Sequence, residues 1–438
     1  MNQFRLITTR RFAPLFITQF LGALNDNIYK NALVIFIAFT LTNQADNNSS
    51  IMVILAAGLF ILPFFLFSAI AGQIADKFEK SGLIQYIKLA EICIMLLASV
   101  GLILLNLPVL MVVLFLMGTQ STLFGPLKYG ILPQHLDESE LIGGNGMIQM
   151  ATYIAILFGT IIGGVLIAFK PHGAYLVSFT VVCVACCGWI SSRFIPVAKP
   201  ADSTLRINWN FASETIHIMG FARENRTVFW SIIAISWFWF YGATFLAMIP
   251  SYTRDILSGN EHVTTLLLAA FSIGIGAGSL LCEKLSHKRI EIGLVPLGAA
   301  GLSLFAIDLY FIGIPSQEII EHGVMINATE YMQNIMNWRV LLDLTCLGFF
   351  GGLYIVPLYA LIQNRSHESR RSRIIAANNI LNALFMVVSA LMTILLLTML
   401  FTIPSIFLIV AILNIVVAAL IFIQIPDFFK SFFRWLKS

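Results

Sequence analysis

The chain has 438 residues, of which 58% are hydrophobic and only 11% are charged, and its formal net charge is +4. Soluble domains carry roughly 25% charged residues, so this composition excludes one large soluble core and predicts an integral membrane protein. The small positive charge is explained by basic loops and indicates no binding of nucleic acid.

Long apolar runs separated by short polar segments predict twelve transmembrane helices. A run of roughly 20 apolar residues is long enough to cross a bilayer, and a helix satisfies its own backbone hydrogen bonds in lipid. No large soluble domain is expected between the spans, and the first run is too long for a cleavable signal. The predicted spans are 12–41, 51–75, 82–105, 107–129, 143–169, 172–197, 227–252, 262–284, 289–314, 337–362, 374–400 and 403–426.

The basic residues predict the orientation. They concentrate at the N-terminus, in the middle loop and in the C-terminal tail, whereas the opposite loops hold only Lys170, Arg254 and Arg339. Cytoplasmic loops carry the excess of Lys and Arg. Both termini are therefore predicted to be cytoplasmic, which requires an even number of spans.

The first predicted span contains QFLGALNDNIYKNAL, which is polar where a transmembrane helix is normally apolar. A charge at mid-membrane costs roughly 2.5–3.5 kcal/mol, so Asp26 and Lys30, one turn apart, require a function or a partner. Helical spacing places Gln19 and Tyr29 on the same face, which we expect to line a substrate cavity, with Asn25 as a further contact. The alternative is that these groups only join helices to one another.

The segment GQIADKFEKS lies between the second and third spans. Gly72 permits close packing, and Asp76 and Lys77 are placed to contact neighbouring helix ends on the cytoplasmic side. The segment resembles the loop signature of the major facilitator superfamily, but Glu79 replaces its second glycine and Ser81 its last basic residue. We predict that Gly72, Asp76 and Lys77 form a gate. The two replacements are expected to make this gate less firmly closed.

Polar residues also mark the end of the fourth span and the start of the fifth. Lys128 and Tyr129 lie in GPLKYGILPQ, and Asn145 and Gln149 lie one turn apart in the next span. We predict that all four contact substrate. The alternatives are that Lys128 extends to lipid headgroups and that the two amides join helices.

The longest predicted cytoplasmic connection, 198–226, divides the spans into six and six. Its apolar residues recur at helical spacing and predict an amphipathic helix that lies on the membrane and ties the halves together. These residues are Trp209, Ala212, Ile216 and Met219.

The seventh span contains WFWFY at 237–241. Trp237, Phe240 and Tyr241 have two interpretations. They form an aromatic belt at the membrane interface, or they form an apolar wall for part of the substrate.

The two halves of the sequence resemble each other. GPLKYGILPQH at 125–135 and YIVPLYALIQN at 354–364 are each followed by a span that opens on Asn, which indicates an internal duplication. Twelve spans in two such halves predict an all-α membrane protein with the major facilitator fold. The expected domains are a six-helix half at 1–197, a linker at 198–226, a second half at 227–426 and a tail at 427–438.

The tail DFFKSFFRWLKS has aromatic residues on one helical face and basic residues on the other. This pattern predicts a helix on the anionic inner leaflet. The alternative is a docking site for a cytoplasmic partner.

Together, QFLGALNDN, GPLKYGILPQ, NGMIQMATYIAILFGTIIGG and VPLYALIQ resemble the bacterial lysophospholipid transporters of the major facilitator superfamily, in particular the form fused ahead of an acyltransferase. No acyltransferase domain is expected in this sequence. The resemblance implies a bacterial inner-membrane flippase that moves lysophospholipid from the outer to the inner leaflet for re-acylation. Asp26 matches the family's first-span carboxylate. Lys128 and Asn145 match the family's motif in the fourth and fifth spans. Leu246 stands where some members have a seventh-span arginine.

Two other functions remain open from the sequence. One is transport of a small water-soluble or drug-like molecule with Asp26 as its proton site, and the other is a membrane scaffold whose tail recruits an acyltransferase. No nucleophile with its base, phosphate-binding loop or metal-ligand set stands out, so we expect neither an enzyme nor a cofactor. The expected partners are lysophospholipid, membrane lipids and a cytoplasmic acyltransferase.

Overall fold

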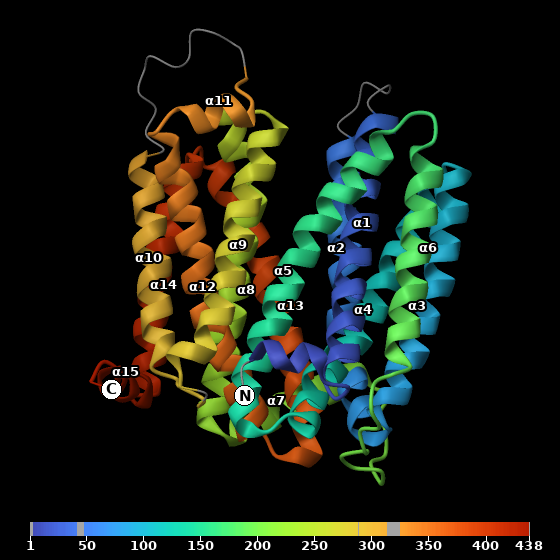
Figure 1. The fold of residues 1–438 in the computed structure, drawn as a ribbon, viewed down its shortest axis with the longest axis vertical. Helices are drawn as coiled ribbons and strands as arrows, with labels where there is room; N and C mark the ends of the chain where they lie inside the picture. The colour runs from blue at the N-terminus through green and yellow to red at the C-terminus, as the bar shows by residue number, and fades with distance from the viewer. Residues whose placement is uncertain (1–2, 42–47, 288, 313–324, 438) are drawn as a thin grey trace. The chain divides into compact units, whose positions relative to one another are not determined.

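The computed structural model describes residues 3–41, 48–287, 289–312 and 325–437. Their regular structure is almost entirely helical (Figure 1), with one isolated β-bridge between Gly259 and Ile326 in these residues. The predicted all-α fold is confirmed. The helices are η1 (Gln3–Thr8), α1 (Ala13–Leu41), α2 (Asn48–Lys77), α3 (Lys80–Ile103), α4 (Leu107–His135), α5 (Glu138–Ala168), α6 (Gly173–Ser192), α7 (Phe211–Glu224), α8 (Arg226–Asp255), α9 (Glu261–Leu285), α10 (Leu294–Ile312), α11 (Ala328–Gln333), α12 (Asn337–Arg365), η3 (Glu368–Arg370), α13 (Arg371–Thr398), α14 (Ile403–Gln424) and α15 (Asp427–Trp435).

Eleven helices in the described part of the chain are long and apolar enough to cross a membrane. The remaining predicted span is α1, which has 29 residues but contains the polar group around Asp26 and is not among the eleven. The structure is therefore consistent with the twelve predicted spans.

Side-chain caps define where several helices begin. Asn106 accepts a hydrogen bond from the backbone N–H of Val109 at the start of α4, and Asn210 does the same for Ser213 at the start of α7. Such a cap satisfies one of the backbone N–H groups that the first helical turn leaves without a partner. Polar residues in these loops therefore fix the helix ends.

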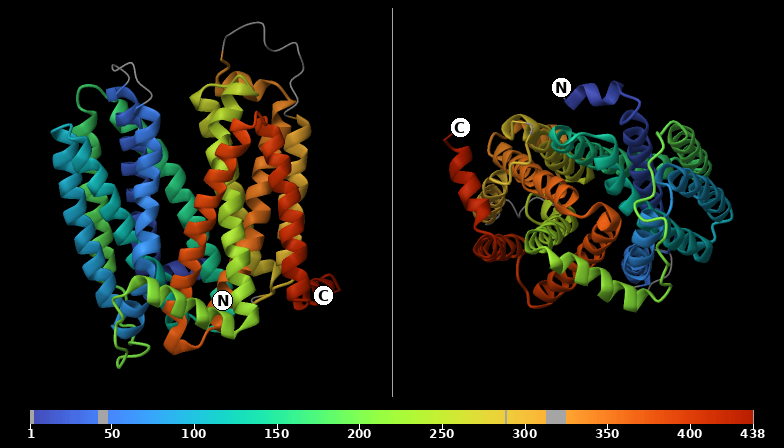
Figure 2. Two further views of the ribbon diagram at one scale, coloured as in Figure 1. Left: turned by 180° about the vertical axis from the view of Figure 1, so that it is seen from behind. Right: turned by 90° about the horizontal axis from the view of Figure 1, so that it is seen from below.

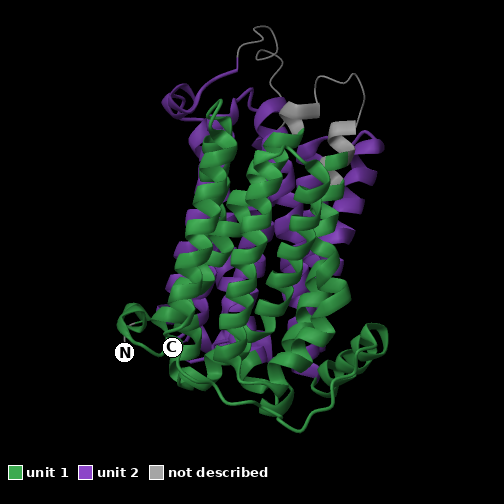
Figure 3. Cartoon of the chain, turned by 90° about the vertical axis from the view of Figure 1, so that its right-hand side faces the viewer, with its two compact units in different colours: residues 1–144, 154–225, 363–383 green, residues 145–153, 226–362, 384–438 purple. Residues whose placement is uncertain are grey.

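The chain divides into two compact units (Figure 3), and each includes a segment from the other half of the sequence. The beginnings of α5 and α13, which follow the two repeated Pro-Leu motifs, are the exchanged segments. Unit 1 consists of Met1–Gly144, Ile154–Asn225 and Gln363–Ala383, and unit 2 of Asn145–Tyr153, Arg226–Ile362 and Leu384–Ser438.

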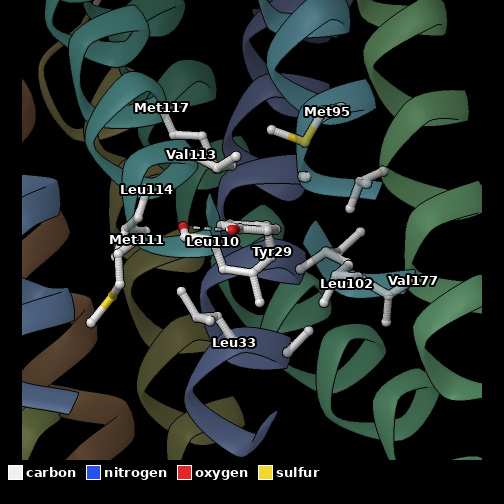
Figure 4. Packing of buried hydrophobic residues seen from close by; sticks show 14 of the residues in the cluster. Tyr29, Leu33, Met95, Leu102, Leu110, Met111, Val113, Leu114, Met117 and Val177 are labelled. Atoms are coloured by element: carbon white, nitrogen blue, oxygen red, sulfur yellow. Dashed lines mark hydrogen bonds between the residues drawn. The ribbon is translucent and has the colours of Figure 1, made fainter. Parts of the chain in front are cut away.

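The hydrophobic core of unit 1 joins α1, α3, α4 and α6 (Figure 4). Tyr29 is fully buried in this core, and its hydroxyl donates a hydrogen bond of 2.8 Å to the carbonyl of Leu110. α2 and α4 also pack closely, since a Cβ at Gly118 would collide with the carbonyl of Phe60. Small residues permit such close helix contacts within a membrane.

Glycines also set the helix contacts of unit 2. A Cβ at Gly274 or Gly278 of α9 would collide with the α12 backbone, at Thr345 and Phe349 respectively. These two helices therefore lie backbone against backbone.

α15 runs crosswise to α14 (Figure 2), as expected for a helix on a membrane surface. Its Phe428 is fully buried, and the indole N–H of Trp435 donates to the carbonyl of Leu285, at 2.7 Å. Phe429 and Phe433 are exposed. One part of the tail therefore anchors it to unit 2, and another is free to contact lipid.

The linker contains the predicted amphipathic helix, α7. Trp209 and Ile216 are exposed, while Ile218 and Ala222 are fully buried in unit 1. The predicted apolar face is therefore the outer one, and a different apolar stripe attaches the helix to the protein.

Candidate functional site

Unit 1 contains a group of polar side chains within otherwise apolar helices, which we call the polar cluster. Its members come from α1, α3 and α4, and each contacts or lies within electrostatic range of another member. They are Asn25, Asp26, Lys30, Lys88, Glu91, Gln120, Ser121 and Lys128.

The centre of the polar cluster is an ion pair between Lys88 and Glu91 of α3. The ammonium of Lys88 lies 2.6 Å from Glu91 Oε2, and both side chains are at most 3% exposed. Asn25 donates a hydrogen bond of 2.9 Å to Glu91 Oε1, and Gln120 donates one of 3.0 Å to Glu91 Oε2, so both carboxylate oxygens accept hydrogen bonds. A buried charge pair is tolerated when its geometry is good and further hydrogen bonds satisfy it.

Gly22 makes room for this pair. A Cβ at Gly22 would collide with the Lys88 ammonium, which also lies 4.9 Å from the centroid of the Phe124 ring. Attraction between a cation and an aromatic face is strongest where water is excluded. The Gly22 position in α1 is therefore fitted to a charge on α3.

Asp26, Lys30 and Lys128 are only partly buried, in contrast to the Lys88–Glu91 pair. Asp26 Oδ2 accepts a hydrogen bond of 2.7 Å from the hydroxyl of Ser121 on α4. The Lys30 and Lys128 ammonium groups lie 4.4 Å and 4.6 Å from the ring centroids of Phe60 and Tyr129, respectively. These three side chains are therefore the ionisable members that keep part of their surface exposed.

The formal charge of the polar cluster is positive. Three ammonium groups, from Lys30, Lys88 and Lys128, face the two carboxylates of Asp26 and Glu91. One positive charge is therefore in excess, which favours an anionic group such as a phosphate. In the described residues, no group of three or more metal-ligating side chains occurs.

Two residues of α1 that were expected to contact substrate, Tyr29 and Asn25, point toward neighbouring helices. Tyr29 is not on the face of Asp26 and Lys30, because it points into the core of unit 1 and bonds to Leu110. Asn25 is fully buried against Glu91. In this structure both side chains bond to neighbouring helices, and their contact with substrate stays a prediction.

The other predicted amides and Tyr129 are buried. Gln19, Tyr129, Asn145 and Gln149 each have at most 5% of their surface exposed. Gln19 and Tyr129 belong to unit 1, and Asn145 and Gln149 belong to unit 2. Their part in substrate binding stays a prediction.

The aromatic residues of α8 pack within unit 2. The indole N–H of Trp237 donates to Asn414 on α14 at 2.8 Å, and its ring stacks on Phe240 at a centroid distance of 4.7 Å. The hydroxyl of Tyr241 donates to the carbonyl of Leu302 on α10 at 2.8 Å. These bonds fix the aromatic side chains in place, and their contact with substrate stays a prediction.

Two of the predicted gate residues of α2, Gly72 and Asp76, lie against the beginning of α13. Asp76 accepts hydrogen bonds from the backbone N–H groups of Ser372 and Arg373, at 3.1 and 3.3 Å, and from the Arg373 guanidinium at 3.0 Å. A carboxylate is stabilised at a helix N-terminus by the free N–H groups and the helix dipole. Asp76 therefore reaches a helix end, as the sequence predicts, while its gating function stays a proposal.

The neighbours of Asp76 complete this contact, which we call the α2–α13 latch and define by Gly72, Asp76 and Arg373. A Cβ at Gly72 would lie 2.7 Å from that of Ala376, so the glycine permits the close approach. Lys77 lies 5.5 Å from the centroid of the Phe78 ring.

Lys88, Glu91 and Arg373 were not among the predicted site residues. Lys88 and Glu91 lie three residues apart within the third predicted span, so the cost of a charge in lipid marks them as clearly as it marks Asp26. Arg373 gives no such signal, because it belongs to a basic loop that the orientation rule already explains.

These features define a class of protein. The sequence profile of the Major Facilitator Superfamily matches residues 15–329, and the chain belongs to that superfamily. It is therefore a multi-pass membrane transporter and not an enzyme.

Curated relatives narrow the comparison. The chain is 26% identical over 334 residues to the lysophospholipid transporter LplT of Enterobacter sp. (strain 638). The aligned region covers 74% of each chain. It is 27% identical over 378 residues to LplT of Photorhabdus laumondii, with 83% of this chain and 82% of the relative covered.

Solved structures agree in fold. The human organic anion transporter MFSD10 gives a TM-score of 0.70 at 10% identity, with 94% of this chain and 99% of that chain covered. The transporter FucP in the outward conformation gives 0.69 at 14% identity, with 94% and 98% covered. At these identities the likeness concerns the fold alone.

Proposed function

We propose that this protein transports lysophospholipids across the bacterial inner membrane, from the outer to the inner leaflet, by alternating access. The observation that carries the proposal is the similarity to the LplT transporters over about three quarters or more of both chains. The lipid is delivered in this scheme to a cytoplasmic acyltransferase for re-acylation.

The chemistry of the polar cluster supports this substrate. A lysophospholipid has one acyl chain and a phosphate headgroup, and the headgroup cannot cross hydrocarbon unaided because its charge is poorly solvated there. The accessible ammonium of Lys128 suits the phosphate, and the accessible carboxylate of Asp26 suits the amine of an ethanolamine headgroup. We propose that these two residues bind the headgroup and that Lys30 assists them.

The rest of the scheme assigns functions to the remaining predicted residues. The aromatic residues Trp237 and Phe240 contact the acyl chain, and Asn145 and Gln149 contact the polar part of the lipid. The α2–α13 latch opens and closes on the cytoplasmic side.

Transport of a lysolipid into vesicles tests this proposal. The full chain is reconstituted into liposomes with fluorescent lysophosphatidylethanolamine, and albumin extracts the lysolipid that remains in the outer leaflet. We expect Asp26→Asn and Lys128→Gln each to slow protection from albumin by at least about tenfold, because each removes a charge-assisted hydrogen bond. Lys199→Gln, which changes an exposed lysine of the linker, is the matched control and should transport normally.

Two outcomes would contradict the proposal. Equal protection in liposomes without the protein would show that it does not move the lipid. Uptake of a small water-soluble molecule, abolished by Asp26→Asn and by an uncoupler while lysolipid stays unmoved, would favour the alternative transporter.

Recruitment of an acyltransferase by the tail is tested separately. Phe428 and Trp435 pack on unit 2, so deleting the tail would disturb the fold. Neutralising Lys430, Arg434 and Lys437 together leaves these contacts in place. Lost re-acylation with normal lipid movement would show recruitment, and unchanged re-acylation would exclude it.

A further inference from the structure

Asp26 of α1 belongs to a closed set of hydrogen bonds across three helices of unit 1, which we call the three-helix network. Its neighbour in the chain, Asn25, donates to Glu91 Oε1 of α3 at 2.9 Å. Gln120 of α4 donates to Glu91 Oε2 at 3.0 Å, and the next residue, Ser121, donates to Asp26 Oδ2 at 2.7 Å. The peptide links from Asn25 to Asp26 and from Gln120 to Ser121 close the network.

The three-helix network is buried except at one end. Asn25, Glu91 and Gln120 are at most 6% exposed, whereas Asp26 and Ser121 are only partly buried. Glu91 is held in place by the Lys88 ammonium, 2.6 Å from its Oε2. The network therefore has a fixed, charged base at Glu91, and Asp26 is its ionisable member with exposed surface.

The chemistry of the partners sets the direction of each bond. The Glu91 carboxylate only accepts hydrogen bonds, so the Gln120 amide turns its NH2 group to Glu91 and its carbonyl oxygen toward Ser121, 3.3 Å away. The Ser121 hydroxyl has one proton and lies between two acceptors, Gln120 Oε1 and Asp26 Oδ2. A bond to an ionised carboxylate is the stronger of the two, and it is also the shorter, so the proton points to Asp26.

One oxygen of Asp26 is therefore committed to α4, which fixes the direction of the other oxygen, Oδ1. A side chain that is already held in its binding conformation loses little freedom when a ligand arrives. Such preorganisation by supporting residues is what makes a binding group selective. A carboxylate oxygen held in this way favours a positively charged group with N–H donors, such as a primary ammonium.

We propose that Ser121 is a positioning residue that gives this transporter a preference for lysolipids with a primary amine in the headgroup. This proposal rests on the proposed function, in which Asp26 binds the headgroup amine. Ser121 acts through Asp26, and the remaining residues of the three-helix network support it. A phosphoglycerol headgroup has no amine, so it gains nothing from the positioned carboxylate.

Transport of two lysolipids by the same protein tests the proposal. The full chain is reconstituted into liposomes with lysophosphatidylethanolamine or lysophosphatidylglycerol, each labelled on its acyl chain so that the headgroup is unchanged. The rate of protection from albumin is measured for each lipid. Ser121→Ala should lower the ratio of the ethanolamine rate to the glycerol rate by at least about fivefold, because only the ethanolamine lipid uses the hydrogen bond to Asp26.

Two further variants show whether the hydroxyl is responsible. Ser121→Thr keeps a hydroxyl at this position and should keep the wild-type ratio. Thr119→Ala is the matched control, because it removes a hydroxyl of α4 that bonds to the carbonyl of Phe115 in its own helix, at 2.9 Å. Its ratio should also equal that of wild type. If Ser121→Ala does not fold, Ser121→Val replaces it, because valine has nearly the shape of threonine without the hydroxyl.

A double variant tests whether Ser121 acts through Asp26. In the Asp26→Asn background, Ser121→Ala should leave the ratio unchanged, because the carboxylate that Ser121 positions is gone. A further fall in the double variant, by the same factor as in the single variant, would overturn the proposal. So would a wild-type ratio in Ser121→Ala, or an equal fall in both rates, which would show a structural role alone.

Failure of the proposed function gives a different result. The wild-type protein would then protect neither lysolipid, and the role of Ser121 would be rejected with the function. If the wild-type protein protects both lipids and only the Ser121 comparison fails, the function stands and the positioning role alone is wrong.

Discussion

At the scale of single residues, burial separates two groups within the polar cluster. Lys88 and Glu91 are buried and form an ion pair with each other, whereas Asp26 and Lys128 keep part of their surface exposed. The first group stabilises unit 1, and we propose that the second binds the headgroup. Charge alone does not distinguish them, because all four are ionisable residues in apolar helices.

The buried Lys88–Glu91 pair is expected to contribute to the stability of unit 1. Glu91→Gln leaves the Lys88 ammonium buried without a counter-charge, and breaking a buried pair in this way costs about 3–5 kcal/mol. We expect a clear fall in the thermal midpoint of the purified protein. The double variant Lys88→Met with Glu91→Gln should recover much of the loss, since it removes the orphaned charge.

The exposed pair Arg254–Asp255 is the control for this prediction. Its side chains are 63% and 45% exposed, so Asp255→Asn should change the midpoint little. A Glu91→Gln variant as stable as wild type would show that Lys88 finds another partner and that the pair is not structural.

At the scale of helices, the α2–α13 latch combines three kinds of interaction. Asp76 satisfies two backbone N–H groups of the first turn of α13 and pairs with Arg373, and Gly72 sets the distance. The linker also bonds to this region, because the N–H groups of Ala201 and Asp202 donate to the carbonyl of Asp76. One residue therefore organises α2, α13 and the linker.

Asp76→Asn should loosen the beginning of α13. Asn keeps an acceptor for the backbone N–H groups but loses the charge that pairs with Arg373 and with the helix dipole. Such a charge is worth about 0.3–2 kcal/mol, which corresponds to a fall of roughly 2- to 30-fold in hydrogen-exchange protection. Exchange of the amides of Ser372 and Arg373, followed by mass spectrometry, measures this effect.

Asp202→Asn is the control for the latch. Asp202 is also near Arg373, but at 3.9 Å and with 28% of its side chain exposed. Equal exchange in Asp76→Asn and Asp202→Asn would contradict a specific cap at Asp76.

The beginning of α3 makes a prediction about pH. Burial favours a raised pKa for the Glu79 carboxyl, but the backbone N–H groups of Ala198, Ser81 and Gly82 donate to it, and the pKa is lowered overall. A lowered pKa stabilises the fold above the unfolded-state value of about 4.3. This contribution is lost as pH falls through the folded-state pKa.

The measurement for Glu79 is exchange of the Ala198 amide, corrected for the intrinsic effect of pH. Protection should be constant above about pH 5 and decline in more acidic buffer. Glu79→Gln should have lower protection at neutral pH and no such decline. A wild-type profile that stays flat in acid would show that the carboxylate does not hold the linker.

At the scale of the whole molecule, the sequence predicted the helical membrane fold because apolar length and the cost of unpaired backbone groups leave few alternatives. The same cost identified Asp26, and it would have identified Lys88 and Glu91. Helical spacing gave a face for Tyr29 but not the neighbour that its hydroxyl meets, which is the carbonyl of Leu110. Its phenol fits both a core and a cavity.

The division into units was not predictable from the local sequence. The sequence repeats predicted contiguous halves, whereas the compact units exchange the segments 145–153 and 363–383. The exchange depends on contacts between residues far apart in the chain, such as Asp76 with Arg373, which no local pattern contains. Both exchanged segments nonetheless follow the repeated Pro-Leu motifs, which are the sequence feature nearest to this property.

A structure of the full chain with bound lysophosphatidylethanolamine is the most direct test of the proposed site. The account predicts that the phosphate lies within hydrogen-bonding distance of the Lys128 ammonium, and the amine within the same distance of Asp26. It also predicts that Lys88 and Glu91 keep their ion pair in the bound state. A headgroup bound away from α1 and α4, with Asp26 still paired only with Ser121, would contradict it.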